Sequence, residues 1–286
     1  MTETAAPEGL LLIDKPSGIT SHDAVESVRR GLGIRKVGHA GTLDPMATGL
    51  LVMGAGRATR VLRFLGDLPK TYEGSFRVGV ETDTLDAEGR VTAERSAEGL
   101  TETAVRLAMA ALVGESLQRP PAFSALKVGG RKLYEAARRG ETLEAASRPI
   151  RVDAFELVAF ASPDIRFRVT CGGGTYVRVL AADVGTALGC GAHLTALRRT
   201  AIGHFRVEDA GSPDVPGTPL PLERAVAHLP RIDVEPDEAE AVTHGRILAP
   251  AGIAGPYGVF GPGGRVLGVY HDDGAKARPL VILVPG

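Results

Sequence analysis

The sequence predicts an α+β protein in which a large mixed domain is followed by a small β-rich one. Some segments carry apolar residues at helical spacing, and others alternate apolar and polar residues as half-buried strands do. Near the end, a proline-rich stretch over residues 211–221 precedes short apolar runs broken by glycine and proline. Both periodicities in one chain, with this late change of character, indicate the fold class.

Two segments are expected to form amphipathic helices, Ser21–Leu32 and Thr101–Val113. Each has apolar residues three or four positions apart, which places them on one side of a helix. A serine opens the first segment and a threonine opens the second, and both residue types cap helices well. Gly33 and Gly114 follow the two segments and can end them.

The strands are expected where the pattern has a period of two. Thr71–Val80 alternates, and in this register Tyr72 points toward the interior. Asp164–Thr170 alternates as well, and Thr175–Leu180 follows a triple-glycine turn, so these two are expected to be adjacent strands. From Leu180 to Leu188 apolar residues recur every fourth position, which indicates a helix with one buried stripe.

The end of the chain is expected to form a separate unit. Residues 211–221 contain four prolines and few apolar residues, as linkers and surface loops do. From Leu229 onward, short apolar runs separated by turn residues suggest a small β-rich domain. We therefore expect domains at residues 1–228 and 229–286.

Composition excludes several classes of protein. The 286 residues include 33 basic and 34 acidic side chains, and 44% of the residues are apolar, as in ordinary globular proteins. Two cysteines are too few for a secreted disulfide scaffold. The sequence has no run of about 18 apolar residues and no basic, apolar leader. These features favour a cytoplasmic protein that does not span a membrane.

Charge is distributed unevenly along this nearly neutral chain. Between Arg29 and Lys70 there are eight basic and two acidic residues, and between Arg119 and Arg151 there are eight basic and three acidic residues. Local basic zones suit a surface that follows phosphates. Solvated helix faces would give the same pattern, so the charge alone decides nothing.

The segment Lys36–Leu51 holds the best candidate for a catalytic residue. Its glycines permit close backbone approach, and Asp44 precedes a proline, which biases the aspartate toward extended geometry. A single carboxylate on such a loop is a candidate nucleophile. A plain Asp-Pro turn with a local hydrogen bond is the alternative reading.

Other chemistries lack their motifs. The glycines at residues 54–59 have neither the lysine nor the spacing of a nucleotide-binding loop. Cys190 and His193 would make one ligand pair, whereas a structural zinc site needs four ligands. A Gly-x-Ser-x-Gly elbow is absent. We therefore expect no metal and no nucleotide or redox cofactor.

Motifs spread over residues 8–199 resemble, in order, those of the TruB family of tRNA pseudouridine-55 synthases, relatives of the dyskerin-type enzymes. The matching segments are Gly9–Gly18, Gly38–Gly49, Lys70–Gly74, Thr82–Gly89, Pro120–Gly130, Leu133–Gly140, Gly174–Arg178 and Gly189–Arg199. The resemblance implies a pseudouridine-synthase-like catalytic domain with a central mixed, mostly antiparallel sheet. It also implies an RNA-contacting insertion at about residues 119–151 and a PUA-like C-terminal domain.

The resemblance assigns roles to individual positions. Asp44 matches the catalytic aspartate, which attacks the target nucleoside covalently. The matching substrate-binding residues are Tyr72, Tyr176, Arg178, Leu197 and His39, and the candidate RNA contacts are Lys15, Lys127, Arg131 and Lys132. Among them, Tyr72 would stack on the flipped uracil, Arg178 would pair with the aspartate, and His39 would fill the place that the base leaves.

The residue types suit these roles on physical grounds. An arginine beside Asp44 would lower the pKa of the carboxyl and orient it through paired hydrogen bonds. Because Arg178 follows Tyr176 by two residues on an expected strand, both side chains would face one pocket. An aromatic face at Tyr72 would stabilise a base taken out of its stack. Ordinary core packing is the alternative for both tyrosines.

The resemblance implies isomerisation of one uridine in the T loop of tRNA, position 55 in tRNA numbering, to pseudouridine after base flipping. The expected partner is the T-arm stem-loop of tRNA, and we expect a monomer with no obligate protein partner and no membrane contact. From Leu229 the chain has seven acidic and five basic residues, so strong RNA contact by this part is not expected.

Two other functions remain open at this point. A tRNA-folding chaperone with incidental modification activity would keep the basic zones and would not need Asp44. A carboxylate-using hydrolase of nucleosides or sugars would need a second acid, for which Asp83 and Asp86 are the candidates.

Overall fold

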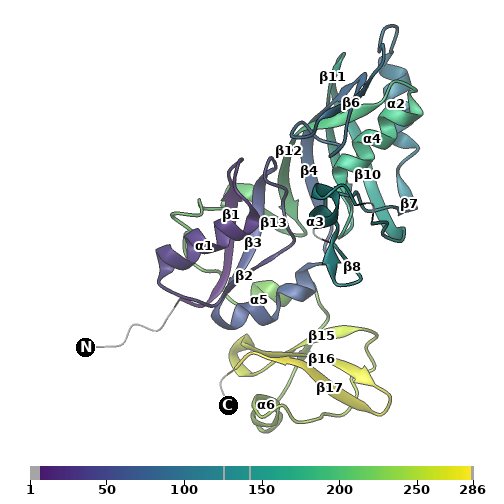
Figure 1. Ribbon diagram of the computed structural model, residues 1–286. Helices are drawn as coiled ribbons and strands as arrows, with labels where there is room; N and C mark the ends of the chain where they lie inside the picture. Colours follow the sequence, from purple (N-terminus) through teal and green to yellow (C-terminus); the bar gives the residue numbers. More distant parts are fainter. Residues whose placement is uncertain (1–6, 125, 142, 285–286) are drawn as a thin grey trace.

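The computed structural model describes residues 7–124, 126–141 and 143–284, and its larger part is built on a nine-stranded sheet (Figure 1). Seven strands follow the spatial order β1-β3-β12-β4-β11-β10-β7, while β2 pairs with β3 and β13 pairs with β12. The strand bounds are β1 Gly9–Lys15, β2 Val37–Ala40, β3 Thr48–Ala55, β4 Lys70–Val78, β7 Gly114–Gln118, β10 Arg148–Ala161, β11 Asp164–Cys171, β12 Ala192–Ile202 and β13 Phe205–Arg206.

Strand pairing in this sheet confirms the expectation of a mixed, mostly antiparallel arrangement. Within the described residues, neighbouring strands are antiparallel except β3 and β12, which pair in parallel. The two segments with a period of two form β4 and β11, and Tyr72 lies opposite Val169. Tyr72 is buried, as its register predicts, with 8% of its surface exposed.

The predicted helix near the N-terminus is α1, Ser21–Leu32, which packs its apolar side on β1 and β3 (Figure 1). Its cap is Thr20, one residue before the expected one. Thr20 and Asp23 each accept a hydrogen bond from the other's backbone, and Gly33 ends the helix with φ 66°. The hydroxyl of Ser21 is therefore free to bind elsewhere, at the loop that carries Asp44.

Two helices cover the other half of the sheet, α2, Glu102–Ala110, and α4, Val177–Ala187 (Figure 1). The expectation of a strand over Thr175–Leu180 is wrong, because α4 begins at Val177. Its buried residues Val177, Leu180, Ala181 and Val184 have helical spacing, and they pack on the sheet. This continuous stripe outweighs the brief alternation at its start. No helix in the described part of the chain is long and apolar enough to cross a bilayer.

Shorter elements connect these layers. Residues 119–147 contain the small hairpin β8–β9 and the helix α3, which lie between β7 and β10 in the chain. The bounds of the short elements are β5 Val80–Thr82, β6 Val91–Glu94, β8 Lys127–Val128, β9 Arg131–Lys132, α3 Leu133–Arg138, α5 Glu223–Val226, and the 3-10 turns η1 Gly56–Arg60, η2 Leu62–Leu65, η3 Val207–Asp209 and η4 Pro262–Gly264.

The C-terminal part forms its own small sheet, as the apolar runs after Leu229 predict. Its spatial order is β14-β15-β16-β17, and β14 and β15 are parallel. The bounds are β14 Arg231–Asp233, α6 Pro236–Thr243, β15 Pro256–Phe260, β16 Val266–Asp273 and β17 Lys276–Ile282.

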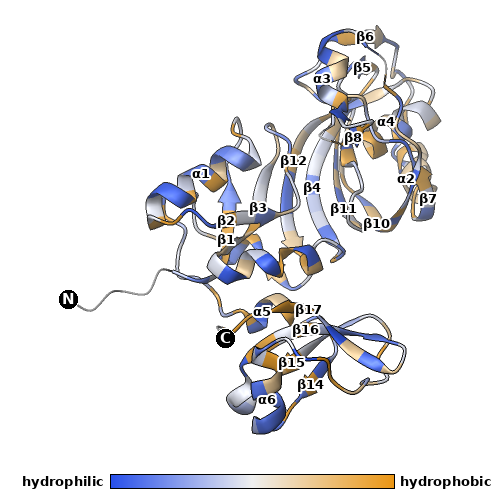
Figure 2. Cartoon of the chain, turned by 60° about the horizontal axis from the view of Figure 1, so that its bottom comes forward, coloured by the Kyte–Doolittle hydropathy of each residue, from blue (hydrophilic) through white to orange (hydrophobic). Residues whose placement is uncertain are grey.

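One apolar cluster, which we call the junction cluster, joins the two sheets. It includes Leu50 of β3, Val226 of α5 and Val269 of β16. In both views α5 lies between the sheets, and Figure 2 shows apolar positions on α5 and on the neighbouring strands β15 and β17. Arg60 and Arg63 also donate hydrogen bonds to backbone carbonyls of β17, at 2.9 and 2.8 Å. The small sheet is thus packed onto the base of the large one.

Candidate active site

A cavity of about 300 Å3 opens where the two halves of the large sheet meet the start of α4. Asp44 reaches it from the loop between β2 and β3, Tyr72 from β4 and Leu197 from β12, while Tyr176 and Arg178 reach it from the N-terminal end of α4. The structure therefore brings together five of the six residues expected at the site.

The loop that carries Asp44 is fixed at several points. Leu43 donates a backbone hydrogen bond to Ser21 Oγ at 2.9 Å, and that hydroxyl donates back to the Leu43 carbonyl at 3.1 Å. Gly49 at the start of β3 has φ 99°, and a Cβ there would collide with the backbone of Arg199. Only glycine fits this close approach without strain. These contacts hold Asp44 at the mouth of the cavity with little freedom of the backbone.

Lys15 binds the same loop through a hydrogen bond to its backbone. Its side chain is fully buried, and Nζ donates to the carbonyls of Pro16, Ile19 and Pro45 at 2.9, 2.7 and 3.2 Å. The expected contact between Lys15 and RNA does not fit this geometry, because the ammonium is enclosed by backbone oxygens. Lys15 instead ties the end of β1 to the residue that follows Asp44. Burial also lowers the pKa of Lys15.

Arg178 lies between two carboxylates. Its Nε is 3.6 Å from Asp44 Oδ2, and its Nη1 is 3.5 Å from Asp86 Oδ2. Nη2 donates to the carbonyl of Phe123 at 2.6 Å. The guanidinium and Asp86 are both buried, with about 5% of each side chain exposed, whereas 42% of the Asp44 side chain is exposed. Arg178 therefore presents one side to Asp44 while Asp86 and the insertion hold the other.

Asp86 also belongs to the site. The sequence analysis named it only as a candidate second acid of a hydrolase. Its Oδ1 accepts hydrogen bonds from Thr84 Oγ1 and the Glu88 backbone at 2.5 and 3.1 Å, so the carboxylate is well satisfied. The only feature of the sequence that could have pointed to Asp86 is its position in the Thr82–Gly89 motif. Periodicity could not connect it with Arg178, which lies 92 residues further along the chain.

The pKa of the Asp44 carboxyl is raised overall, although Arg178 lowers it as expected. Burial is the largest cause, because desolvation disfavours the charged form. Arg178 opposes this effect, and the negative charge of Asp86 adds to it. The carboxylate is thus partly desolvated, although 42% of the side chain is exposed, and a guanidinium lies 3.6 Å away without the paired hydrogen bonds expected from the sequence. Partial desolvation beside a cation suits a nucleophile.

A change at Asp86 should be visible in the pH dependence of the reaction. We expect ionised Asp44 to be the reactive form, so that activity should fall as the pH drops through the pKa of Asp44. Asp86→Asn removes a like charge and lowers that pKa, and we expect the acidic limb of kcat/KM against pH to move down by about 1 pH unit. Asp83→Asn, at the exposed neighbouring acid, should leave the limb in place. A limb that stays in place or moves up in Asp86→Asn would contradict this assignment.

Tyr72 is packed beneath a second buried arginine. The guanidinium carbon of Arg199 lies 5.9 Å from the centre of the Tyr72 ring, and 1% of Arg199 is exposed. Arg199 donates to the carbonyls of Leu50 and Gly41 at 2.7 and 3.1 Å, so it links β3 to the loop of Asp44. Burial raises the pKa of the Tyr72 phenol, which is therefore neutral near pH 7. The sequence analysis quoted Arg199 at the end of the Gly189–Arg199 motif but gave it no role, because a buried arginine leaves no periodic signal.

Tyr176 precedes the first residue of α4, and both sides of the insertion hold it. Its backbone N–H donates to Gln118 Oε1 at 2.8 Å, and its carbonyl accepts from Gln118 Nε2 at 3.2 Å. The guanidinium carbon of Arg148 lies 4.8 Å from the centre of the Tyr176 ring. Gln118 and Arg148 lie opposite each other in the β7–β10 ladder. The ends of the insertion therefore meet at Tyr176.

This geometry makes Gln118 a positioning residue for Tyr176. Gln118→Leu keeps the volume and removes both hydrogen bonds, and we expect kcat to fall about 10-fold, the scale for buried polar groups left unpaired. Gln118→Glu keeps an acceptor for the Tyr176 N–H and should lose less. Single-turnover rates, with thermal unfolding as the control for folding, separate the two variants. Equal losses in both, or none in Gln118→Leu, would contradict the role.

The other expected residues lie outside the cavity wall. His39 lies on β2, where burial lowers its pKa and favours the neutral imidazole. Lys127, Arg131 and Lys132 lie on the hairpin β8–β9, with Lys127 and Arg131 exposed. Two of these cations already have acidic neighbours, at 2.7 Å for Arg131 with Glu141 and 3.7 Å for Lys132 with Glu135. The hairpin remains a candidate surface for phosphates.

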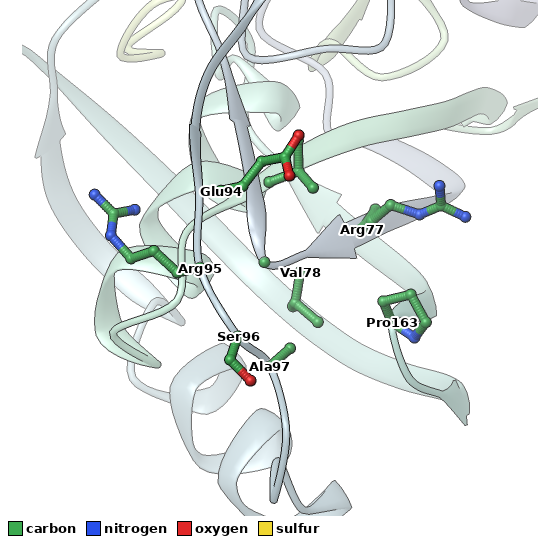
Figure 3. A pocket seen from close by; sticks show the side chains of 9 residues that line it. Arg77, Val78, Glu94, Arg95, Ser96, Ala97 and Pro163 are labelled. Atoms are coloured by element: carbon green, nitrogen blue, oxygen red, sulfur yellow. The ribbon is translucent and has the colours of Figure 1, made fainter.

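A second hollow at the far end of β4 lacks the features of a reactive site (Figure 3). Its two arginines are ion-paired, Arg77 with Asp164 at 2.8 Å and Arg95 with Glu81 at 2.5 Å. Figure 3 shows Arg77, Glu94 and Arg95 pointing in different directions around it. The charged groups therefore do not converge on a ligand, in contrast to those at Asp44.

Comparison with known proteins identifies the family. Residues 29–177 match the family model described as TruB family pseudouridylate synthase, N-terminal domain. A tRNA pseudouridine synthase B of Mycobacterium sp. (strain KMS) is 47% identical over 97% of this chain and 96% of its own. The chain belongs to the TruB family of pseudouridine synthases. It is accordingly an isomerase, as the motifs predict.

Further matches cover the rest of this TruB-family chain. Residues 178–212 match a tRNA pseudouridylate synthase B C-terminal domain, and residues 229–284 match the C-terminal model of tRNA pseudouridine synthase II. A tRNA pseudouridine synthase B of Thermobifida fusca (strain YX) is 46% identical over 96% of this chain and 98% of its own.

Solved structures confirm the fold. The archaeal box H/ACA sRNP Nop10–Cbf5 complex contains a chain that superposes with a TM-score of 0.76 at 25% identity, covering 98% of this chain and 87% of that chain. A Cbf5–Nop10–Gar1 complex gives a TM-score of 0.75 at 26% identity, covering 97% and 85%. The pseudouridine-synthase-like fold implied by the motifs is thus confirmed.

Proposed function

We propose that this TruB-family enzyme converts one uridine in the T loop of tRNA, position 55 in tRNA numbering, to pseudouridine through a covalent adduct of Asp44. The observation that carries the proposal is the 3.6 Å approach of Arg178 Nε to the Asp44 carboxylate at a cavity of nucleoside size. The names of the relatives support tRNA as the substrate. The basic zones along the chain agree with a polyanionic partner.

Each site residue has a part in the proposed reaction. Asp44 bonds to the everted nucleoside, and Arg178 orients its carboxylate. The glycosidic bond from C1′ to N1 breaks, the uracil turns, and C5 bonds to C1′. The C5 hydrogen leaves as a proton, N1 gains a proton, and release of the adduct restores Asp44. Atoms and charge balance within the pocket, so the reaction needs no cofactor or external energy source.

The walls of the cavity suit an everted base. Tyr72 and Tyr176 offer aromatic faces and Leu197 an apolar side, and base stacking contributes about 1–3 kcal/mol. This offsets the cost of flipping, which is a few kcal/mol and lowest in a loop. His39, on the neighbouring strand β2, would occupy the space that the base leaves in the RNA. The hairpin with Lys127, Arg131 and Lys132 would follow the phosphates of the T arm.

The chain divides into a catalytic domain and a small C-terminal domain in this proposal. We place the boundary between the catalytic and C-terminal domains at residues 228 and 229, where the family models and the small sheet support it. The enzyme acts on the T arm as a monomer and without an obligate protein partner, unlike the structural relatives solved with Nop10. The excess of acidic residues in the C-terminal part argues against tight RNA contact there.

One experiment tests substrate and reaction together. tRNA transcripts carrying tritium at C5 of uridine are incubated with the protein, and the positions that lose label are mapped. We expect release at a single T-loop uridine and no free uracil in the product. Release at other positions would overturn the substrate, whereas free uracil would show that the enzyme hydrolyses the glycosidic bond.

A further inference from the structure

The hydroxyl of Ser124 is a buried polar group with no role in the reaction proposed above. Ser124 belongs to the insertion, 5% of its surface is exposed, and it lines the same cavity as Asp44 and Arg178. Its Oγ has no hydrogen-bond partner among the described residues. A buried hydroxyl left unpaired is unfavourable, and one that lines a cavity is a natural partner for a polar group of a bound ligand.

The backbone holds this hydroxyl in a defined place. The carbonyl of Phe123, one residue earlier, accepts a hydrogen bond from Arg178 Nη2 at 2.6 Å. The carbonyl of Ser124 itself accepts from the backbone N–H of Tyr134 at 3.1 Å, at the start of α3. Two backbone contacts therefore hold the Phe123–Ser124 segment between Arg178 and the helix of the insertion.

Other partly buried hydroxyls of the large sheet find partners within the protein. Ser75 Oγ lies 2.8 Å from Thr195 Oγ1, and Thr71 Oγ1 lies 3.1 Å from Thr170 Oγ1. These pairs stand on strands next to the cavity and none of them lines it. Within the described part of the chain, Ser124 Oγ and Thr175 Oγ1 are both unpaired and both residues line the cavity, whereas these paired hydroxyls of the sheet do not.

We propose that Ser124 Oγ hydrogen-bonds the polar edge of the everted uracil and so takes part in recognising the base. The walls at Tyr72, Tyr176 and Leu197 can cover the faces of a pyrimidine, and the unpaired Ser124 Oγ adds a polar group to the same cavity. A uracil edge presents two carbonyl oxygens and one N–H, and a serine hydroxyl can donate to the former or accept from the latter. This inference rests on the proposed function, because it requires a flipped uridine in the cavity.

A recognition group on the insertion couples base contact to the contact with Arg178. Phe123 and Ser124 are neighbours, so the contact that holds Arg178 and the contact that holds the base come from one short segment. The base would be gripped fully only while this segment is seated against Arg178. A nucleotide lacking the polar edge would leave Ser124 unpaired and lose this part of the binding.

The test compares Ser124→Ala with Ser75→Ala, a matched removal of a hydroxyl that does not line the cavity. We expect kcat/KM for a T-arm hairpin to fall about 10-fold in Ser124→Ala, the scale of one lost hydrogen bond to an unpaired partner, and to stay within twofold in Ser75→Ala. The second measurement is the Kd for the same hairpin with an abasic ribose at the target position. Wild type and Ser124→Ala should bind this RNA equally.

Two outcomes would overturn the inference. Activity of Ser124→Ala within twofold of wild type would show that the hydroxyl makes no contact with the substrate. Weaker binding of the abasic hairpin by Ser124→Ala would show that the hydroxyl supports the insertion or the sugar-phosphate backbone instead of the base. Failure of the proposed function is distinct from both, because wild type itself would then release no tritium from the hairpin.

Discussion

Asp44→Asn should abolish isomerisation while tRNA binding persists. The amide keeps the shape of the side chain but cannot form the covalent adduct, and we expect the single-turnover rate to fall by about 10³-fold or more, the scale for loss of a covalent nucleophile. Tritium release from C5-labelled tRNA measures the rate, and filter binding measures the Kd. The Kd should change little, because phosphate contacts provide most of the affinity.

A matched control for this variant is Asp164→Asn, which removes an aspartate paired with Arg77 away from the cavity. Its isomerisation rate should equal that of wild type. The same proteins also separate catalysis from a chaperone function, because Asp44→Asn should refold tRNA as well as wild type does if folding activity exists beside the enzyme. Full isomerisation by Asp44→Asn would contradict the mechanism.

Arg178→Lys should also slow isomerisation strongly, although lysine keeps the positive charge. The guanidinium contacts Asp44, Asp86 and the carbonyl of Phe123 through three different nitrogens, and one ammonium cannot reach all three. We expect kcat to fall about 10²-fold, as when a preorganised donor is lost, with a smaller change in KM. Single-turnover kinetics over a range of tRNA concentrations measure the two effects separately.

Folding must be checked in this variant, because breaking a buried ion pair costs about 3–5 kcal/mol. Lysine leaves a cation beside Asp86, so we expect Arg178→Lys to stay folded in thermal unfolding, and Arg166→Lys at an exposed arginine of β11 serves as the control. An unchanged single-turnover rate in a folded Arg178→Lys protein would show that the fork of the guanidinium is not needed.

Local patterns in the sequence account for much of the fold. The periods of α1 and β4 follow from burial on one side, so their residues could be assigned within one or two positions. The start of α4 could not, because Val177, Arg178 and Val179 alternate as a strand would and follow a glycine-rich turn. Whether they extend or coil depends on the sheet beneath Leu180 and Val184, and a sequence pattern does not contain that surface.

Some residues of the site could likewise be found from the sequence, and others only from the structure. Asp44, Tyr72 and Arg178 stand in motifs, and the structure places all three at one cavity. Asp86 and Gln118 act through contacts that span 92 and 58 residues, which no local pattern records. The net direction of the pKa of Asp44 also needed the structure, because the depth of burial decides between desolvation and the nearby guanidinium.

The junction cluster makes the large domain depend on the C-terminal sheet. Leu50 and Val226 share their apolar contacts with Val269 of the small sheet, and β17 accepts hydrogen bonds from the turns that follow β3. A chain truncated after residue 228 would expose this surface to water and leave Arg60 and Arg63 without their acceptors. The small sheet therefore stabilises β3, the strand that follows the Asp44 loop. Proteins truncated before this sheet should be poorly soluble.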